Sequence, residues 1–151
     1  MSHFIEIATS TPCKHREHPT ADIGSGSARR LGSVLQEHTV QYPHLADMAT
    51  WLIDLHIGSH LGGFRYCDVD PAPEAPLPGG LTEEERQMIP KELTALRDYR
   101  AWLRGIRDGL YRVIASDERV RDDPHLRGIA EEFTEMLLFC DSCVGTLVAA
   151  A

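Results

Sequence analysis

The sequence lacks long apolar runs and has few lysines. No stretch reaches the about 18 consecutive apolar residues of a transmembrane helix, and the N-terminal MSHFIEIATS has no basic start followed by an apolar segment of signal length. Lysine accounts for only 2 of the 15 basic residues and arginine for 13, while 23 acidic residues give a formal net charge of -8. Such a chain has no general positive field to attract nucleic acid or anionic membrane. We therefore expect a cytoplasmic protein that binds neither.

Cysteines are also few, and the familiar catalytic motifs are missing. The four cysteines do not form a secreted disulfide framework, because 151 residues can bury a core without such bridges. There is no nucleophile elbow, phosphate-binding glycine loop or dinucleotide fingerprint, and the Glu-x-x-His motif of di-iron bundles is absent. No reaction class is indicated, so the expectation is a binding protein without catalysis.

What the sequence does have is helical periodicity from residue 26 onward. Apolar residues recur at three- and four-residue spacing, and a proline-rich stretch from 68 to 80 separates two pairs of such segments. Residues 1–25 read as an irregular arm with one β-like run, Phe4 to Ala8. The prediction is an all-α, single-domain four-helix bundle over 26–151, with an antiparallel hairpin of the first two helices, a long Pro-rich crossover and a second pair. The first predicted helix starts at Ser27 and breaks at Tyr42-Pro43, and the second runs from Pro43 to a stop at Gly62-Gly63. The third runs from a cap at Thr82 to about Ala115, and the fourth from the Asp123-Pro124 cap nearly to the end. Pro90 predicts a kink or restart in the third.

Histidines on the first two predicted helices are candidate metal ligands. His56 and His60 are four residues apart, so a helix would stack them on one side, and His38 lies within the apolar stripe of the preceding helix. With His38 or His44 as a third ligand, neutral imidazoles in this arrangement would bind a transition metal such as zinc or iron. The alternative is that they are core histidines whose ring nitrogens bond backbone or hydroxyl groups.

The cysteines offer a second, separate metal hypothesis. Cys140 and Cys143 have the spacing of a zinc pair, and Cys13 with His15 or His18 would complete a tetrahedron. Against this, the pair lies inside a predicted helix, where packing in the core is the simpler role.

An arginine stripe marks the third predicted helix. Arg97, Arg100, Arg104 and Arg107 are spaced three and four apart, so they line one face beside the apolar stripe. Such a row would hold a phosphate, a carboxylate ligand or an acidic partner helix. The alternative, which we favour at this point, is pairing with acids of a neighbouring helix. No acidic residue is expected at the centre of the apolar stripes of the third and fourth helices.

Large aromatic residues suggest a second apolar surface. Trp51, Trp102 and Phe139 fall at the margins of their stripes, which is typical of an intermolecular contact. We therefore expect a homodimer, with a protein partner as a further option. The alternative is that wide stripes close these aromatics into the core of one chain.

Overall fold

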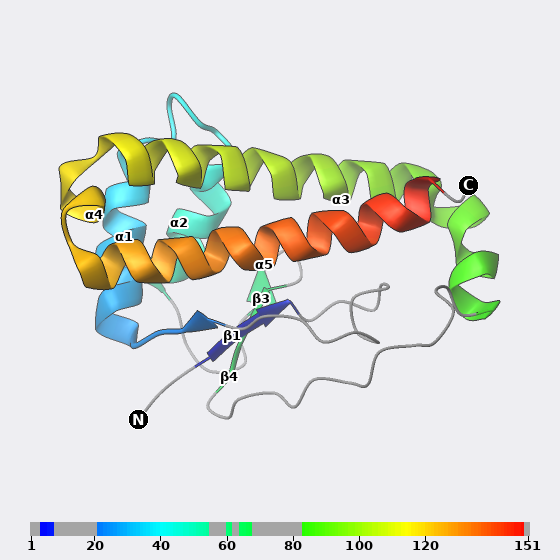
Figure 1. Ribbon diagram of the computed structural model, residues 1–151, viewed down its shortest axis with the longest axis horizontal. Helices are drawn as coiled ribbons and strands as arrows, with labels where there is room; N and C mark the ends of the chain where they lie inside the picture. The colour runs from blue at the N-terminus through cyan, green and yellow to red at the C-terminus, as the bar shows by residue number, and fades with distance from the viewer. Residues whose placement is uncertain (1–3, 8–20, 55–59, 62–63, 68–82, 150–151) are drawn as a thin grey trace.

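The computed structural model describes residues 4–7, 21–54, 60–61, 64–67 and 83–149. Within these ranges lie five helices and four short strands (Figure 1). The helices are α1 (Ser25–Gln36), α2 (Leu45–Ile53), α3 (Glu83–Ser116), α4 (Glu118–Arg121) and α5 (Pro124–Ala149). The strands are β1 (Phe4–Ile7), β2 (Ala21–Asp22), β3 (His60–Leu61) and β4 (Phe64–Cys67). The helical fold predicted from the sequence is confirmed, and the small sheet is an addition to it.

Helices α3 and α5 form a long antiparallel pair, joined through the single turn of α4 (Figure 1). Each end of this connection has an aspartate cap. The Asp117 side chain accepts a hydrogen bond from the backbone N–H of Arg119 at the start of α4. The Asp123 carboxylate accepts from the backbone N–H groups of His125 and Leu126 at the start of α5. These bonds satisfy amide donors that have no partner within a first helical turn.

Helix α3 is interrupted near its beginning. Pro90 lies inside it, and two residues later Glu92 has non-helical backbone angles, with φ of -116° and ψ of 15°. Proline removes a backbone donor and its ring crowds the preceding turn, so a break here has a local cause. The kink or restart predicted from Pro90 is confirmed.

Helices α1 and α2 form a second hairpin, which depends on glycine at its closest contacts. A Cβ atom on Gly32 of α1 would lie 2.9 Å from the Ala49 backbone oxygen and 3.0 Å from the Leu52 Cβ atom of α2. Only glycine permits helices to approach this closely. Figure 1 shows α1 and α2 standing across the α3–α5 pair instead of running alongside it. One bundle axis shared by four helices is therefore not confirmed.

The four strands form an antiparallel sheet in the order β2-β1-β4-β3. Phe4 is paired with Cys67 and Ile7 with Phe64, so the β-like run expected from residue 4 is realised as β1. The division of the chain at residue 25 stays a prediction.

The second predicted helix is shorter than expected. It ends at Ile53, because Asp54 at its C-cap leaves helical geometry with φ of -105° and ψ of 29°. His60 lies on β3, so the prediction that one helix carries His56 and His60 is wrong for His60.

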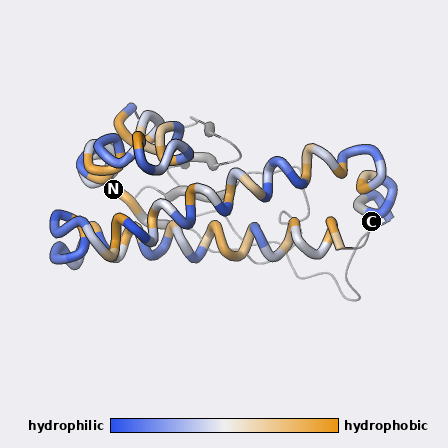
Figure 2. The backbone as a smooth tube through the Cα atoms, turned by 90° about the horizontal axis from the view of Figure 1, so that it is seen from above, coloured by the Kyte–Doolittle hydropathy of each residue, from blue (hydrophilic) through white to orange (hydrophobic). Residues whose placement is uncertain are grey.

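The core lies between the two hairpins and along the α3–α5 interface. Figure 2 shows apolar residues recurring along α3 and α5. The largest fully buried side chains are Phe133, Ile23, Leu31, Leu35, Leu45, Met48, Leu52, Leu103 and Ile106. In the part of the chain that the structure describes, no helix is long and apolar enough to cross a membrane.

Candidate functional site

A buried carboxylate stands at the centre of the candidate site. Asp141 on α5 has a side chain only 8% exposed, and with Thr134 it is one of two buried polar residues among those described. The expectation that no acid occupies the centre of an apolar stripe is wrong here. Asp141 follows Leu137 by four residues and precedes Val144 by three, so it shares their buried face. The sequence signal that could have revealed Asp141 is a charged residue at the spacing of the buried face, because a buried charge requires a partner.

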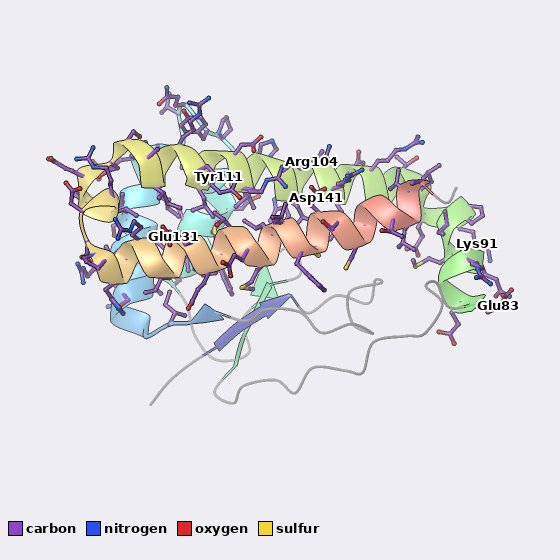
Figure 3. All side chains as sticks on the ribbon, viewed as in Figure 1. Glu83, Lys91, Arg104, Tyr111, Glu131 and Asp141 are labelled. Atoms are coloured by element: carbon purple, nitrogen blue, oxygen red, sulfur yellow. The ribbon has the colours of Figure 1, made fainter. Side chains whose placement is uncertain are left out.

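Three arginines of α3 supply that partner. The Arg100 Nε donates to Asp141 Oδ1 at 2.6 Å, and the Arg104 Nε donates to the same oxygen at 3.0 Å. The Arg107 Nη1 donates to Oδ2 at 3.0 Å. Figure 3 shows Arg104 and Asp141 where α3 and α5 run side by side. We call these three arginines and Asp141 the arginine cluster. Arg100, Arg104 and Arg107 of the predicted arginine stripe therefore pair with an acid of a neighbouring helix.

The local sequence explains why the cluster forms. The three arginines occur at positions i, i+4 and i+7 of α3, so they lie on one face over two helical turns. Gly145 lies one turn beyond Asp141 on α5 and leaves space for the Arg100 guanidinium. A Cβ atom on Gly145 would be 2.7 Å from the Arg100 Nη2. Glycine at this position therefore lets Arg100 lie close against α5.

Two opposing effects act on the Asp141 carboxyl. Burial by itself raises its pKa, because a charged group is disfavoured away from water. The hydrogen bonds from the three arginines lower the pKa by more, and the result lies below the ordinary value of 3.8. Asp141 is therefore ionised at neutral pH, and the cluster contains three guanidiniums and one carboxylate.

An open groove lies over the outer side of the arginine cluster. Its volume is about 510 Å³, and we call it the arginine groove; its lining residues are Arg97, Arg100, Ala101, Arg104, Gly105, Asp108 and Val148. Arg104 is about half exposed, at 48%, whereas Arg100 is 28% exposed. Asp108 is exposed and lies 3.8 Å from Arg107 through an Nε–Oδ1 contact.

Arg97 belongs to this groove without belonging to the cluster. Its neighbours at helical spacing are Leu93, Thr94, Arg100 and Ala101, none of which is acidic. Its side chain makes no hydrogen bond or ion pair with any residue of the described ranges. Arg97 thus adds a positive charge that nothing in these ranges neutralises.

The candidate metal-ligating histidines are not brought together within the described ranges. His38 Nε2 lies 2.8 Å from Asp117 Oδ2, and His44 is exposed at the N-cap of α2. His60 lies on β3, while His56 falls outside the described residues. No group of three or more histidine, cysteine, aspartate or glutamate residues that could hold a metal occurs in the described part of the chain.

His38 instead belongs to an ion-pair network that joins α1 to α4. Arg119 donates to Asp117 through both Nε and Nη2, and its Nη1 donates to Glu37. The hydrogen bond from Arg119 is the main reason that the pKa of Asp117 lies far below its usual range; burial opposes this shift, and the His38 contact adds to it. The network therefore holds Asp117 as a carboxylate at the α4 cap.

The cysteine pair of α5 is buried. Cys140 and Cys143 carry reduced thiols, and Cys140 Sγ lies 3.7 Å from the Tyr99 hydroxyl. Of the other ligands in the zinc hypothesis, Cys13 and the two histidines after it lie outside the described residues.

The aromatic residues that suggested a second surface lie in or against the core. Trp51 is 7% exposed, whereas Trp102 and Phe139 are partly buried and pack on core residues. Trp102 also stacks on Tyr99, with ring centroids 6.0 Å apart. These residues are accounted for within one chain, and the homodimer stays a prediction.

Comparison of the chain with family models, curated proteins and solved structures finds no match.

Proposed function

We propose that the protein acts by binding, without catalysis of its own, and that it holds an anionic ligand in the arginine groove. The ligand carries phosphate or carboxylate groups, whose geometry suits the planar guanidinium fork. The observation that carries the proposal is the ratio of three arginines to one buried carboxylate.

The charge balance of this region supports the proposal. Arg97, Arg100, Arg104 and Arg107 bring four positive charges, against two negative charges on Asp108 and Asp141. A surplus of two positive charges therefore stands in a chain whose formal net charge is -8. Such a local reversal of sign attracts anions to this groove and away from the rest of the surface.

The hydrogen-bonding capacity of the cluster points the same way. A guanidinium has five N–H donors, and each of the three arginines donates one hydrogen bond to Asp141. Arg104 and Arg100 also line the groove and are partly exposed. Their remaining donors are available to a ligand. Asp141 holds the guanidiniums in place before the ligand binds.

The experiment is a thermal unfolding series with inorganic phosphate, in wild type and two variants. Phosphate at about 100 times its Kd would add about 2.7 kcal/mol, or a rise of roughly 5–10 °C in Tm for a domain of this size. Arg104→Ala should lose most of this rise. It leaves Arg100 and Arg107 on Asp141, so the unliganded protein should still fold.

Arg112→Ala is the matched control. Arg112 lies on the same helix, is exposed and does not line the arginine groove, so the variant makes the same change in charge elsewhere. It should keep the full rise in Tm. An equal loss in both variants, or no rise in wild type with phosphate, sulfate or citrate, would contradict anion binding in this groove.

Self-association and binding of a protein partner are further proposals for the same chain. Sedimentation at micromolar concentration tests the homodimer directly, and a strict monomer would remove it.

A further inference from the structure

We propose that the ligand of the arginine groove is a short linear polyphosphate, bound along α3 from Arg97 to Arg104. This inference rests on the proposed anion-binding function and specifies the ligand class. It follows from the spacing of the positive charges, from the residue that ends their row, and from the side chains that line the groove.

The spacing favours an extended ligand. Arg97, Arg100 and Arg104 all line the groove, and the first and last are seven residues apart, which is about 10 Å along the helix axis. A single phosphate or carboxylate is only a few ångströms across, so it reaches guanidiniums one turn apart but not both ends of the row. A chain of phosphates places a charged group opposite each arginine in turn.

The side of the arginine row that faces Asp141 (the inner side) and the side that faces the groove (the outer side) differ in the partners that their arginines already have. On the inner side, the Asp141 carboxylate occupies Nε of both Arg100 and Arg104. On the outer side, Arg97 has no partner within the described ranges, and it stands at the end of the row. A phosphate carries more negative charge than a carboxylate and has acceptor oxygens pointing in several directions. A phosphate chain therefore suits this outer side better than a second carboxylate.

Asp108 sets one end of the binding row. It lines the groove one turn beyond Arg104, and its negative charge opposes further extension of a polyanion in that direction. The positive segment is thus bounded, which favours a chain of about three phosphates over a long polymer.

The lining also distinguishes a bare polyphosphate from a nucleotide. Ala101 and Val148 are its apolar side chains, and none of the described residues lining the groove is aromatic. A nucleobase would find no ring on which to stack, so a base should add little affinity. Binding should depend on the phosphate chain alone.

Isothermal titration with phosphate, pyrophosphate, tripolyphosphate, ATP and citrate tests the inference. Tripolyphosphate should bind at least about tenfold tighter than phosphate, which corresponds to about 1.4 kcal/mol, and ATP should bind no tighter than tripolyphosphate. In Arg97→Ala the advantage of tripolyphosphate over phosphate should fall to less than about threefold. Arg112→Ala should keep the full advantage, because it removes the same charge outside the groove.

The outcomes separate this inference from the function on which it rests. If phosphate and tripolyphosphate bind equally and both require Arg104, the groove binds anions but the ligand is not a chain. If citrate matches tripolyphosphate, the ligand is a polycarboxylate, and this inference is overturned. If ATP binds much more tightly than tripolyphosphate, the phosphate chain is not the determinant. If no anion binds to wild type, the proposed function itself fails.

Discussion

Replacing Asp141 by asparagine should lower stability and at the same time strengthen anion binding. The substitution keeps the size of the side chain and one acceptor oxygen, but it removes the negative charge that three guanidiniums share. Hydrogen bonds to a charged group contribute about 1.5–3 kcal/mol and neutral ones about 0.5–1.5 kcal/mol. The exposed fractions of the arginines range from 16% to 48%, so they recover part of the loss from water. We expect a net loss of about 2–3 kcal/mol, or a fall of roughly 5–10 °C in Tm.

The pH dependence of this loss has a defined sign. The pKa of Asp141 in the folded protein lies below its ordinary value of 3.8, so its ionisation stabilises the fold above that value. This contribution disappears as the pH falls through the lowered pKa of the folded state. The difference between wild type and Asp141→Asn should therefore be full at pH 7 and should shrink in acid below about pH 4.

Urea unfolding at several pH values, with phosphate titrations beside it, measures both effects. Asp98→Asn is the control, since Asp98 is exposed on α3; it should change stability by less than about 0.5 kcal/mol. Removing the Asp141 charge leaves the groove more positive, so phosphate should bind a few-fold more tightly. A variant as stable as wild type at neutral pH would refute the stabilising role of the cluster. Weaker phosphate binding would show that positioning by Asp141 matters more than the charge that it neutralises.

Further predictions concern helix contacts, a cap and metal. Gly32→Ala should cost about 1–3 kcal/mol in denaturant unfolding, because its Cβ would lie 2.9 Å from the Ala49 backbone oxygen, whereas Gly128→Ala has open space and should be neutral or stabilise by up to about 1 kcal/mol. Asp117→Ala should cost about 0.5–2 kcal/mol at pH 7 through loss of the α4 cap. Because the pKa of the Asp117 carboxyl is lowered in the folded protein, its contribution to wild-type stability should vanish only in strong acid. Urea unfolding curves at pH 7 and in acid measure this difference between wild type and variant. Metal binding that involves His56 stays a prediction: elemental analysis of untagged protein should then find about one equivalent of zinc or iron, and His56→Ala should lose it. Less than about a tenth of an equivalent would end that hypothesis.

Much of the helical framework could be predicted because its signals are local. The Asp123-Pro124 cap marks the start of α5, Pro90 marks the interruption of α3, and the apolar stripes indicate which faces are buried. The arginine row was visible for the same reason, since a single helix defines its spacing.

The features that the sequence did not reveal depend on contacts between distant segments. Strands β2 and β3 have only two residues each, too few to show a two-residue period. They form only by pairing with β1 and β4. The apolar pattern of α2 continues beyond Ile53, where Asp54 ends the helix. Asp141 lies between Cys140 and Cys143 in the sequence, and its partners lie 34 to 41 positions earlier in the chain.

The buried thiols of α5 can report local opening of the molecule through their reactivity. Cys140 is fully buried and directly precedes Asp141, and Cys143 follows two residues later. A thiol reagent reaches the fully buried Cys140 only when α5 separates from its neighbours, so the labelling rate of this one residue measures the population of that opened state. If an anion binds in the arginine groove as proposed, it stabilises the closed state and slows the labelling of Cys140. Labelling of Cys140, one residue from Asp141, would then report binding in the groove without an introduced probe.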